Sequence, residues 1–124
     1  MPGILRIKAR SGRTHKPQGE MNGLERRYAE HLQCRKLAGE IADFWFAKIK
    51  LKLAKICYLT VDFAVLMADG TIEFHECKGF LEDDAAVKVK VAAQEFWWFK
   101  FVLVKARAKK HGGGFEIAEL GEMA

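Results

Sequence analysis

The stretch VDFAVLMADGTIEFHECKGF, Val61 to Phe80, decides the fold of this 124-residue chain because it holds two apolar runs around a turn. Its centre, Ala68-Asp69-Gly70, fits a three-residue hairpin loop in which Gly70 takes the left-handed conformation that most side chains avoid. Met67 then pairs with Thr71, and all further pairs follow from that register. The stretch therefore predicts a β-hairpin over 57–67 and 71–78.

The same register places charge at one end of the hairpin. Asp62 falls opposite Glu76 on one face, and Lys78 lies two residues further along that face. A two-residue Asp-Gly turn would instead oppose Asp62 to Cys77 and separate the carboxylates onto two faces. Opposed carboxylates repel each other unless a positive group lies between them, and Lys78 or a divalent cation would supply it. The alternative interpretation is an ordinary ion pair at a hairpin end, which contributes little.

Regular structure is predicted on both sides of the hairpin. Asn22 and Glu25 form a capping-box pattern, which predicts a helix that begins there and ends at Gly39. Four further segments have helical or strand periodicity: a strand over 44–53, a helix over 84–96 that Asp83-Asp84 caps, and strands over 99–105 and 115–120. A helix between the strands 71–78 and 99–105 lets them lie parallel. We expect an α/β (α+β) fold with a mixed central β-sheet flanked by helices.

The composition fits one globular domain, since half of the residues are apolar and 30% are charged. We expect a basic N-terminal arm over 1–20, a single domain over 21–120 and a tail over 121–124. No apolar run approaches the roughly 20 residues that a membrane-spanning helix needs. The first residues also lack the apolar centre of a signal peptide. A cytoplasmic protein with no membrane partner is therefore expected.

The net charge of +5 is concentrated near the two ends of the chain. Basic ends favour a polyanionic partner because each neutralised phosphate releases counterions, although solubilising tails are the alternative. We expect the following basic residues to contact a polyanion such as DNA: Arg6, Lys8, Arg10, Arg13, Lys16, Lys109 and Lys110.

The three cysteines are expected to be free thiols. Their number is odd and no CxxC pair occurs, which argues against a disulfide framework. A zinc site could be assembled from His31, Cys34, Cys57, His75 and Cys77, but the paired knuckles typical of structural zinc are missing.

Several of these motifs, taken in order, resemble the PD-(D/E)XK nuclease superfamily, and more narrowly a family of small phage-encoded endonucleases similar to Holliday junction resolvases. The resemblance covers about 80 residues. The matching stretches are Asn22-Gly23-Leu24-Glu25, Tyr58-Leu59-Thr60-Val61-Asp62-Phe63, His75-Glu76-Cys77-Lys78-Gly79, and Asp83-Asp84-Ala85 with Lys88 and Lys90. Val61 stands where the family has a proline, which is not a ligand. The resemblance implies a restriction-endonuclease-like αβββαβ core.

The resemblance also implies roles for individual residues. Asp62 and Glu76 would bind Mg²⁺ or Mn²⁺, with the backbone carbonyl of Cys77 as a third ligand. Lys78 would orient the attacking water and stabilise the charge that develops on phosphorus. Glu25 would hold a second metal ion or its water, although a capping box alone explains this residue equally well.

A second group of residues has two interpretations each. Residues on the second helix are expected to contact DNA, with a solvated face as the alternative: Lys88, Lys90 and Gln94. His75 alternates away from Glu76 and is interpreted as a packed or surface histidine. The Trp97-Trp98 pair could stack on unpaired bases, but packing in the core or at a dimer interface is the stronger expectation.

The sequence thus favours a Mg²⁺-dependent DNA endonuclease that acts on branched DNA such as a Holliday junction. Two symmetric cuts need two sites, so a homodimer is expected. The alternative is a non-catalytic nucleic-acid-binding module with a degenerate nuclease fold, and a third hypothesis is a structural or assembly protein. The complete set of Asp62, Glu76 and Lys78 favours the enzyme.

Overall fold

A computed structural model describes residues 20–78 and 83–120, and for residues 83–86 it describes the backbone only. The predicted tail and nearly all of the predicted N-terminal arm, with its expected DNA contacts from Arg6 to Lys16, lie outside these residues. The helices and strands, in chain order, are α2 (Gly23–Leu37), β1 (Ile41–Phe46), β2 (Lys50–Ala54), β3 (Cys57–Thr60), β4 (Phe63–Met67), β5 (Ile72–Lys78), α3 (Asp83–Glu95), β6 (Lys100–Ala106), the 3₁₀ turn η1 (Lys109–His111) and β7 (Phe115–Leu120).

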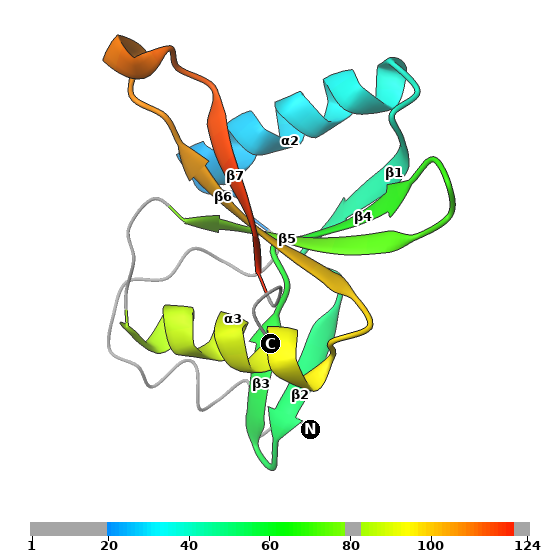
Figure 1. Ribbon diagram of the computed structural model, residues 1–124, viewed down its shortest axis with the longest axis vertical. Helices are drawn as coiled ribbons and strands as arrows, with labels where there is room; N and C mark the ends of the chain where they lie inside the picture. The colour runs from blue at the N-terminus through cyan, green and yellow to red at the C-terminus, as the bar shows by residue number, and fades with distance from the viewer. Residues whose placement is uncertain (1–19, 79–82, 121–124) are drawn as a thin grey trace.

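Five strands form a mixed sheet in the order β1-β4-β5-β6-β7 (Figure 1). β1, β4 and β5 are antiparallel neighbours, β6 pairs parallel to β5 after the intervening α3, and β7 pairs antiparallel to β6. β2 and β3 form a separate two-stranded ribbon between β1 and β4 in the chain. Without the ribbon, the order is helix, three antiparallel strands, helix, a parallel strand and the final antiparallel strand β7. The predicted mixed sheet flanked by helices is therefore confirmed.

The predicted register of the hairpin is also confirmed. Phe63 pairs with His75, and Leu66 pairs with Ile72, so the two strands meet as the three-residue loop requires. The loop closes through Met67, whose N–H donates to the carbonyl of Thr71 over 2.8 Å. Gly70 has a φ of +93°, the left-handed conformation that a glycine adopts without strain.

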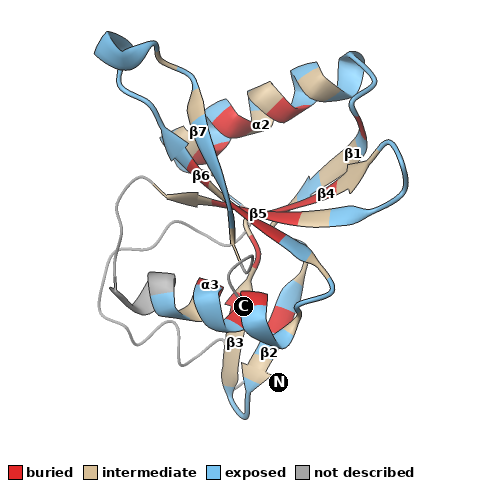
Figure 2. Ribbon diagram, viewed as in Figure 1, coloured by how far each residue is buried: buried red, intermediate tan, exposed pale blue. Residues whose placement is uncertain are grey.

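Two apolar clusters cover the two faces of the sheet (Figure 2). On one face, α2 contributes Tyr28 and Leu32 to a cluster with sheet residues such as Phe63 and Val65. On the other face, α3 and the β2–β3 ribbon pack together against Phe74 and neighbouring side chains. Because alternate residues of β5 point to opposite faces, Glu76 shares the α3 face with Phe74, and His75 shares the α2 face.

Two features of the sequence prediction are wrong. The segment 44–53 is not one strand, because the chain turns at Ala47, whose φ of 54° interrupts the extended conformation between β1 and β2. The segment 57–67 is likewise divided into β3 and β4, with Asp62 in a bend between them. Asp62 therefore lies where the chain passes from the ribbon to the main sheet.

The expectation that the Trp97-Trp98 pair packs in the core is also wrong. The two side chains are 74% and 59% exposed and contact each other edge to face after the end of α3. Their predicted contact in a dimer stays a prediction. Among residues 20–78 and 83–120, no helix has both the length and the apolar character needed to cross a membrane.

Candidate active site

Asp62 and Glu76 lie together where β4 begins and β5 ends, on two interior strands of the sheet, and backbone groups fix the position of both. The N–H of Asp62 donates to Oε2 of Glu76 over 3.0 Å, and the N–H of Cys77 donates to Oδ2 of Asp62 over 2.9 Å. Each carboxylate is thus held by the backbone of the opposing segment. Fixed positions of this kind are typical of binding and catalytic groups, which have to be held before the ligand arrives.

Burial changes the pKa of the Glu76 carboxyl in this pair. Glu76 is only 4% exposed, and this burial, followed by the negative charge of Asp62, raises the pKa of the Glu76 carboxyl well above its usual range. The charge of Lys78 and the hydrogen bond from the Asp62 backbone act in the opposite direction but are outweighed. The Asp62 side chain acts in the same direction as burial, so the pKa of Glu76 is raised and the pair retains a proton more tightly than an ordinary carboxylate does.

Two lysines lie at the end of the strands that carry the pair. Lys78 is the last residue of β5, half-buried, and shares the Glu76 face. The parallel register pairs Lys105 of β6 with Lys78, so two lysines come from the ends of neighbouring strands. Lys105 was not among the predicted site residues. The alternation of β6 pointed to it only once the pairing of β6 with β5 was known.

Glu25 forms the capping box at the beginning of α2 that its position in the sequence predicts. The N–H of Asn22 donates to Oε1 of Glu25 over 2.9 Å, and the N–H of Glu25 donates to Oδ1 of Asn22 over 2.8 Å. The predicted capping box is therefore confirmed, and Glu25 is 4% exposed. The beginning of α2, the end of β5 and the beginning of α3 lie toward the same side of the molecule (Figure 1). Its role toward a metal stays a prediction.

The donor atoms of the pair fit a hard divalent cation. Carboxylate oxygens suit Mg²⁺ or Mn²⁺, and Mg²⁺ commonly takes one or two carboxylates and completes its shell with waters and phosphate oxygens. A cation at this position would replace the proton that the pair otherwise retains. Within the described part of the chain, no three His, Cys, Asp or Glu side chains gather in an arrangement that could hold a metal. The pair therefore offers two protein carboxylates, which suits Mg²⁺ better than zinc.

The other predicted DNA contacts lie on the surface in two places. Lys90 and Gln94 are exposed and Lys88 is half-buried, all on α3, which packs on the same face of the sheet as Glu76. Lys109 and Lys110 are exposed in the short helical turn between β6 and β7. Their exposure leaves them accessible, and their contacts with DNA remain predictions.

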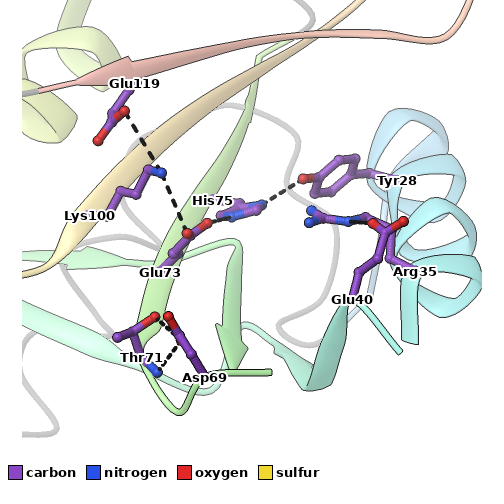
Figure 3. Close-up of polar contacts among 9 residues, drawn as sticks. All are labelled: Tyr28, Arg35, Glu40, Asp69, Thr71, Glu73, His75, Lys100 and Glu119. Carbon is purple, nitrogen blue, oxygen red and sulfur yellow. Dashed lines mark hydrogen bonds and ion pairs between the residues drawn. The ribbon is translucent and has the colours of Figure 1, made fainter. Parts of the chain in front are cut away.

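The opposite face of β5 carries a second polar group, built around His75 (Figure 3). The hydroxyl of Tyr28 lies 2.6 Å from Nδ1 of His75, and Nε2 of His75 lies 2.9 Å from Oε1 of Glu73. The hydrogen bond with His75 lowers the pKa of Glu73, so Glu73 accepts as a carboxylate and Tyr28 donates to Nδ1. His75 is 2% exposed, which confirms the predicted packed histidine.

A shallow hollow of about 680 Å³ borders this group, but its charged side chains are paired with one another. Nε of Arg35 contacts Glu40 at 2.8 Å, and Nζ of Lys100 lies between Glu73 at 3.6 Å and Glu119 at 3.8 Å. We therefore assign the group to the stability of the α2–sheet contact.

Replacing Tyr28 with phenylalanine is expected to lower the free energy of unfolding by about 1–2 kcal/mol at neutral pH, because the buried Nδ1 of His75 loses its donor. Chemical denaturation measures this loss. Tyr58→Phe is the matched control, since Tyr58 lies half-buried on the ribbon with no hydrogen bond from its hydroxyl to another described residue. Equal stability of the two variants would contradict the assignment.

Comparison with known proteins identifies no relative: no family model, curated protein or solved structure matches the chain. The function is therefore argued from the geometry of the chain's own residues and from the resemblance of its motifs.

Proposed function

We propose that the chain is a Mg²⁺-dependent DNA endonuclease that hydrolyses phosphodiester bonds at the Asp62–Glu76–Lys78 site. The observation that carries the proposal is the carboxylate pair, which backbone hydrogen bonds hold at the end of the central strand β5, close to Lys78. A buried Glu76 beside the half-buried Asp62 is costly to the fold, so a binding or catalytic role explains the pair better than stability does. The order of the elements also agrees with the αβββαβ core that the motif resemblance implies.

Each residue has a separate part in this reaction. Asp62 and Glu76 would hold the cation, with the Cys77 carbonyl as the third ligand. When bound, Mg²⁺ polarises the scissile phosphate and lowers the pKa of a water. Lys78 orients the attacking water and stabilises the negative charge that develops on the phosphate oxygens. The water oxygen forms a bond to phosphorus and releases a proton to solvent, and the bond from phosphorus to the 3′ oxygen breaks. The 3′ oxygen takes up a proton from solvent, which leaves a 5′-phosphate and a 3′-hydroxyl.

The proposed substrate is branched DNA, for which a Holliday junction is the test molecule. The shape of a junction offers several closely spaced phosphates, which suit the exposed lysines on α3 and on the η1 turn. Symmetric cuts at a junction need two sites, so we propose a homodimer, which light scattering would measure directly.

The substrate class is tested by a panel of labelled DNAs: a four-way junction, a three-way junction, a nicked duplex, a linear duplex and a single strand. Each is incubated with the protein in Mg²⁺ and in EDTA. We expect cleavage of the branched molecules in Mg²⁺ at least about tenfold faster than that of the linear duplex, since a rate ratio of ten needs only about 1.4 kcal/mol of preferential binding. DNA binding without cleavage of any panel member would instead support the non-catalytic binding module.

A further inference from the structure

The β2–β3 ribbon has one apolar and one basic face. Leu51, Leu59 and Val61 are buried against α3, and Ile49 and Leu53 pack on the same cluster. The residues that alternate with them therefore face away from α3. This outer face carries Lys50 and Lys52 on β2, with Tyr58 and Thr60 opposite them on β3, and the exposed Lys48 directly precedes β2 with the same alternation.

The charges of this face are not neutralised within the described chain. The segment from Phe44 to Val61 contains four lysines and no acidic residue. None of these lysines makes an ion pair with any residue that the structure describes, and Nζ of Lys50 lies 5.9 Å from the centre of the Tyr58 ring. Lys50 and Lys52 are exposed. Three like charges on one narrow face repel each other, so the face suits an anionic partner.

The row of lysines leads to the carboxylate pair. Lys50 pairs with Thr60, and the ladder continues beyond it: the N–H of Val61 donates to the carbonyl of Ile49, and the N–H of Ala47 donates to the carbonyl of Asp62, each over 2.9 Å. Lys48 therefore lies just before β2, in the short segment whose backbone bonds to Val61 and Asp62. Alternate residues of a strand are about 6.6–6.8 Å apart, a spacing comparable to that of successive phosphates on one nucleic-acid strand.

We propose that the outer face of the β2–β3 ribbon binds the sugar–phosphate backbone of a DNA strand and directs it toward Asp62. Lys52, Lys50 and Lys48 contact successive phosphates, and Tyr58 provides a flat surface beside them. The inference rests on the proposed nuclease function only where it says that the DNA strand is directed toward Asp62. The binding of DNA by the ribbon is measured separately from cleavage. These lysines are a different set from the expected contacts on α3 and at the ends of the chain.

The test compares two variants with the same loss of charge. The ribbon variant carries Lys48→Gln, Lys50→Gln and Lys52→Gln, and the control variant carries Arg26→Gln, Arg27→Gln and Lys36→Gln on α2, which covers the other face of the sheet (Figure 1). Binding of a fluorescein-labelled four-way junction is followed by anisotropy in Ca²⁺ over a series of salt concentrations, and cleavage of the same junction is followed in Mg²⁺. A third variant with three Lys→Arg substitutions keeps the charge of the ribbon, and circular dichroism checks that each variant is folded.

The ribbon variant is expected to bind the junction roughly 10- to 100-fold more weakly at about 0.1 M salt, and the slope of log Kd against log salt should fall by nearly 3, about 0.9 for each phosphate contact. The control and Lys→Arg variants should stay within about threefold of the unmodified chain, since they keep the ribbon charges. Equal weakening in the ribbon and control variants, or no weakening in either, would overturn the inference. An unmodified chain that binds through the ribbon but cleaves nothing would leave the inference intact and contradict the proposed function. An unmodified chain that binds no junction would overturn both.

Discussion

Replacing Glu76 with glutamine is expected to lower the rate of Mg²⁺-dependent cleavage by at least about 1000-fold, because one carboxylate ligand of the cation is lost. A loss of several kcal/mol of charge stabilisation in the transition state has this effect on the rate. The same substitution should make the metal-free fold more stable at pH 8, by roughly 1–3 kcal/mol, because a neutral amide replaces a carboxylate that is buried beside Asp62. Opposite changes in activity and stability would mark Glu76 as a residue that serves function at the expense of the fold.

The pH dependence of stability provides the control for this prediction. The pKa of Glu76 is raised in the folded protein, so the folded state binds its proton more tightly than the unfolded state does. The stabilising contribution of this proton is fully present below the ordinary carboxyl pKa and is lost as the pH rises through the raised value. Urea unfolding in EDTA should therefore show the advantage of Glu76→Gln at pH 8 and its disappearance toward pH 4.

Glu95→Gln, at an exposed position on α3, is the control substitution. It should leave the cleavage rate unchanged and the free energy of unfolding within about 0.5 kcal/mol of the unmodified chain. A Glu76→Gln protein that cleaves normally, or that is clearly less stable at pH 8, would contradict the electrostatic account of the pair.

Replacing Phe63 with alanine is expected to lower the free energy of unfolding by about 3–5 kcal/mol, a large part of the roughly 5–15 kcal/mol that stabilises a small domain. The Phe63 side chain is fully buried, and its ring centre lies 5.3 Å from that of Phe46 and 5.5 Å from that of Tyr28. It thus joins β1, β4 and α2 in one cluster, and it directly follows Asp62 in the chain.

Chemical denaturation measures this loss, and Trp97→Ala is the contrasting truncation of a large aromatic side chain. Because Trp97 is 74% exposed, its removal should change stability by no more than about 0.5 kcal/mol in the monomer. Equal costs for the two substitutions would show that the aromatic cluster around Phe63 does not stabilise the fold.

The sequence predicted the hairpin and the carboxylate pair because both depend on local signals. Gly70 sets the length of the loop, and the loop length sets the register, so the meeting of Asp62 with Glu76 follows from the chain alone. The capping box of Asn22 and Glu25 is local in the same sense. Parallel pairing of β5 with β6 could also be expected, since a helix of suitable length separates them.

Features that depend on non-local packing could not be predicted. The alternation from Phe44 to Leu53 looks the same whether the chain continues straight or turns at Ala47, and only the structure shows the turn that creates the ribbon. The hydrogen bond between Tyr28 and His75 joins residues 47 positions apart, and no short pattern indicates it. Likewise, the exposure of Trp97 depends on where α3 ends relative to the sheet.

The central claim is that Asp62, Glu76 and Lys78 form one metal-dependent site that cleaves DNA. The most direct measurement is single-turnover cleavage of a four-way junction at saturating protein, for the unmodified chain and for Asp62→Asn and Lys78→Gln, in Mg²⁺ and in EDTA. We predict that the unmodified chain cleaves the junction in Mg²⁺ and not in EDTA. Each variant should still bind the junction but cleave it at least about 100-fold more slowly, since removal of one transition-state contact costs about this much. Cleavage at the same rate by all three proteins would contradict the claim.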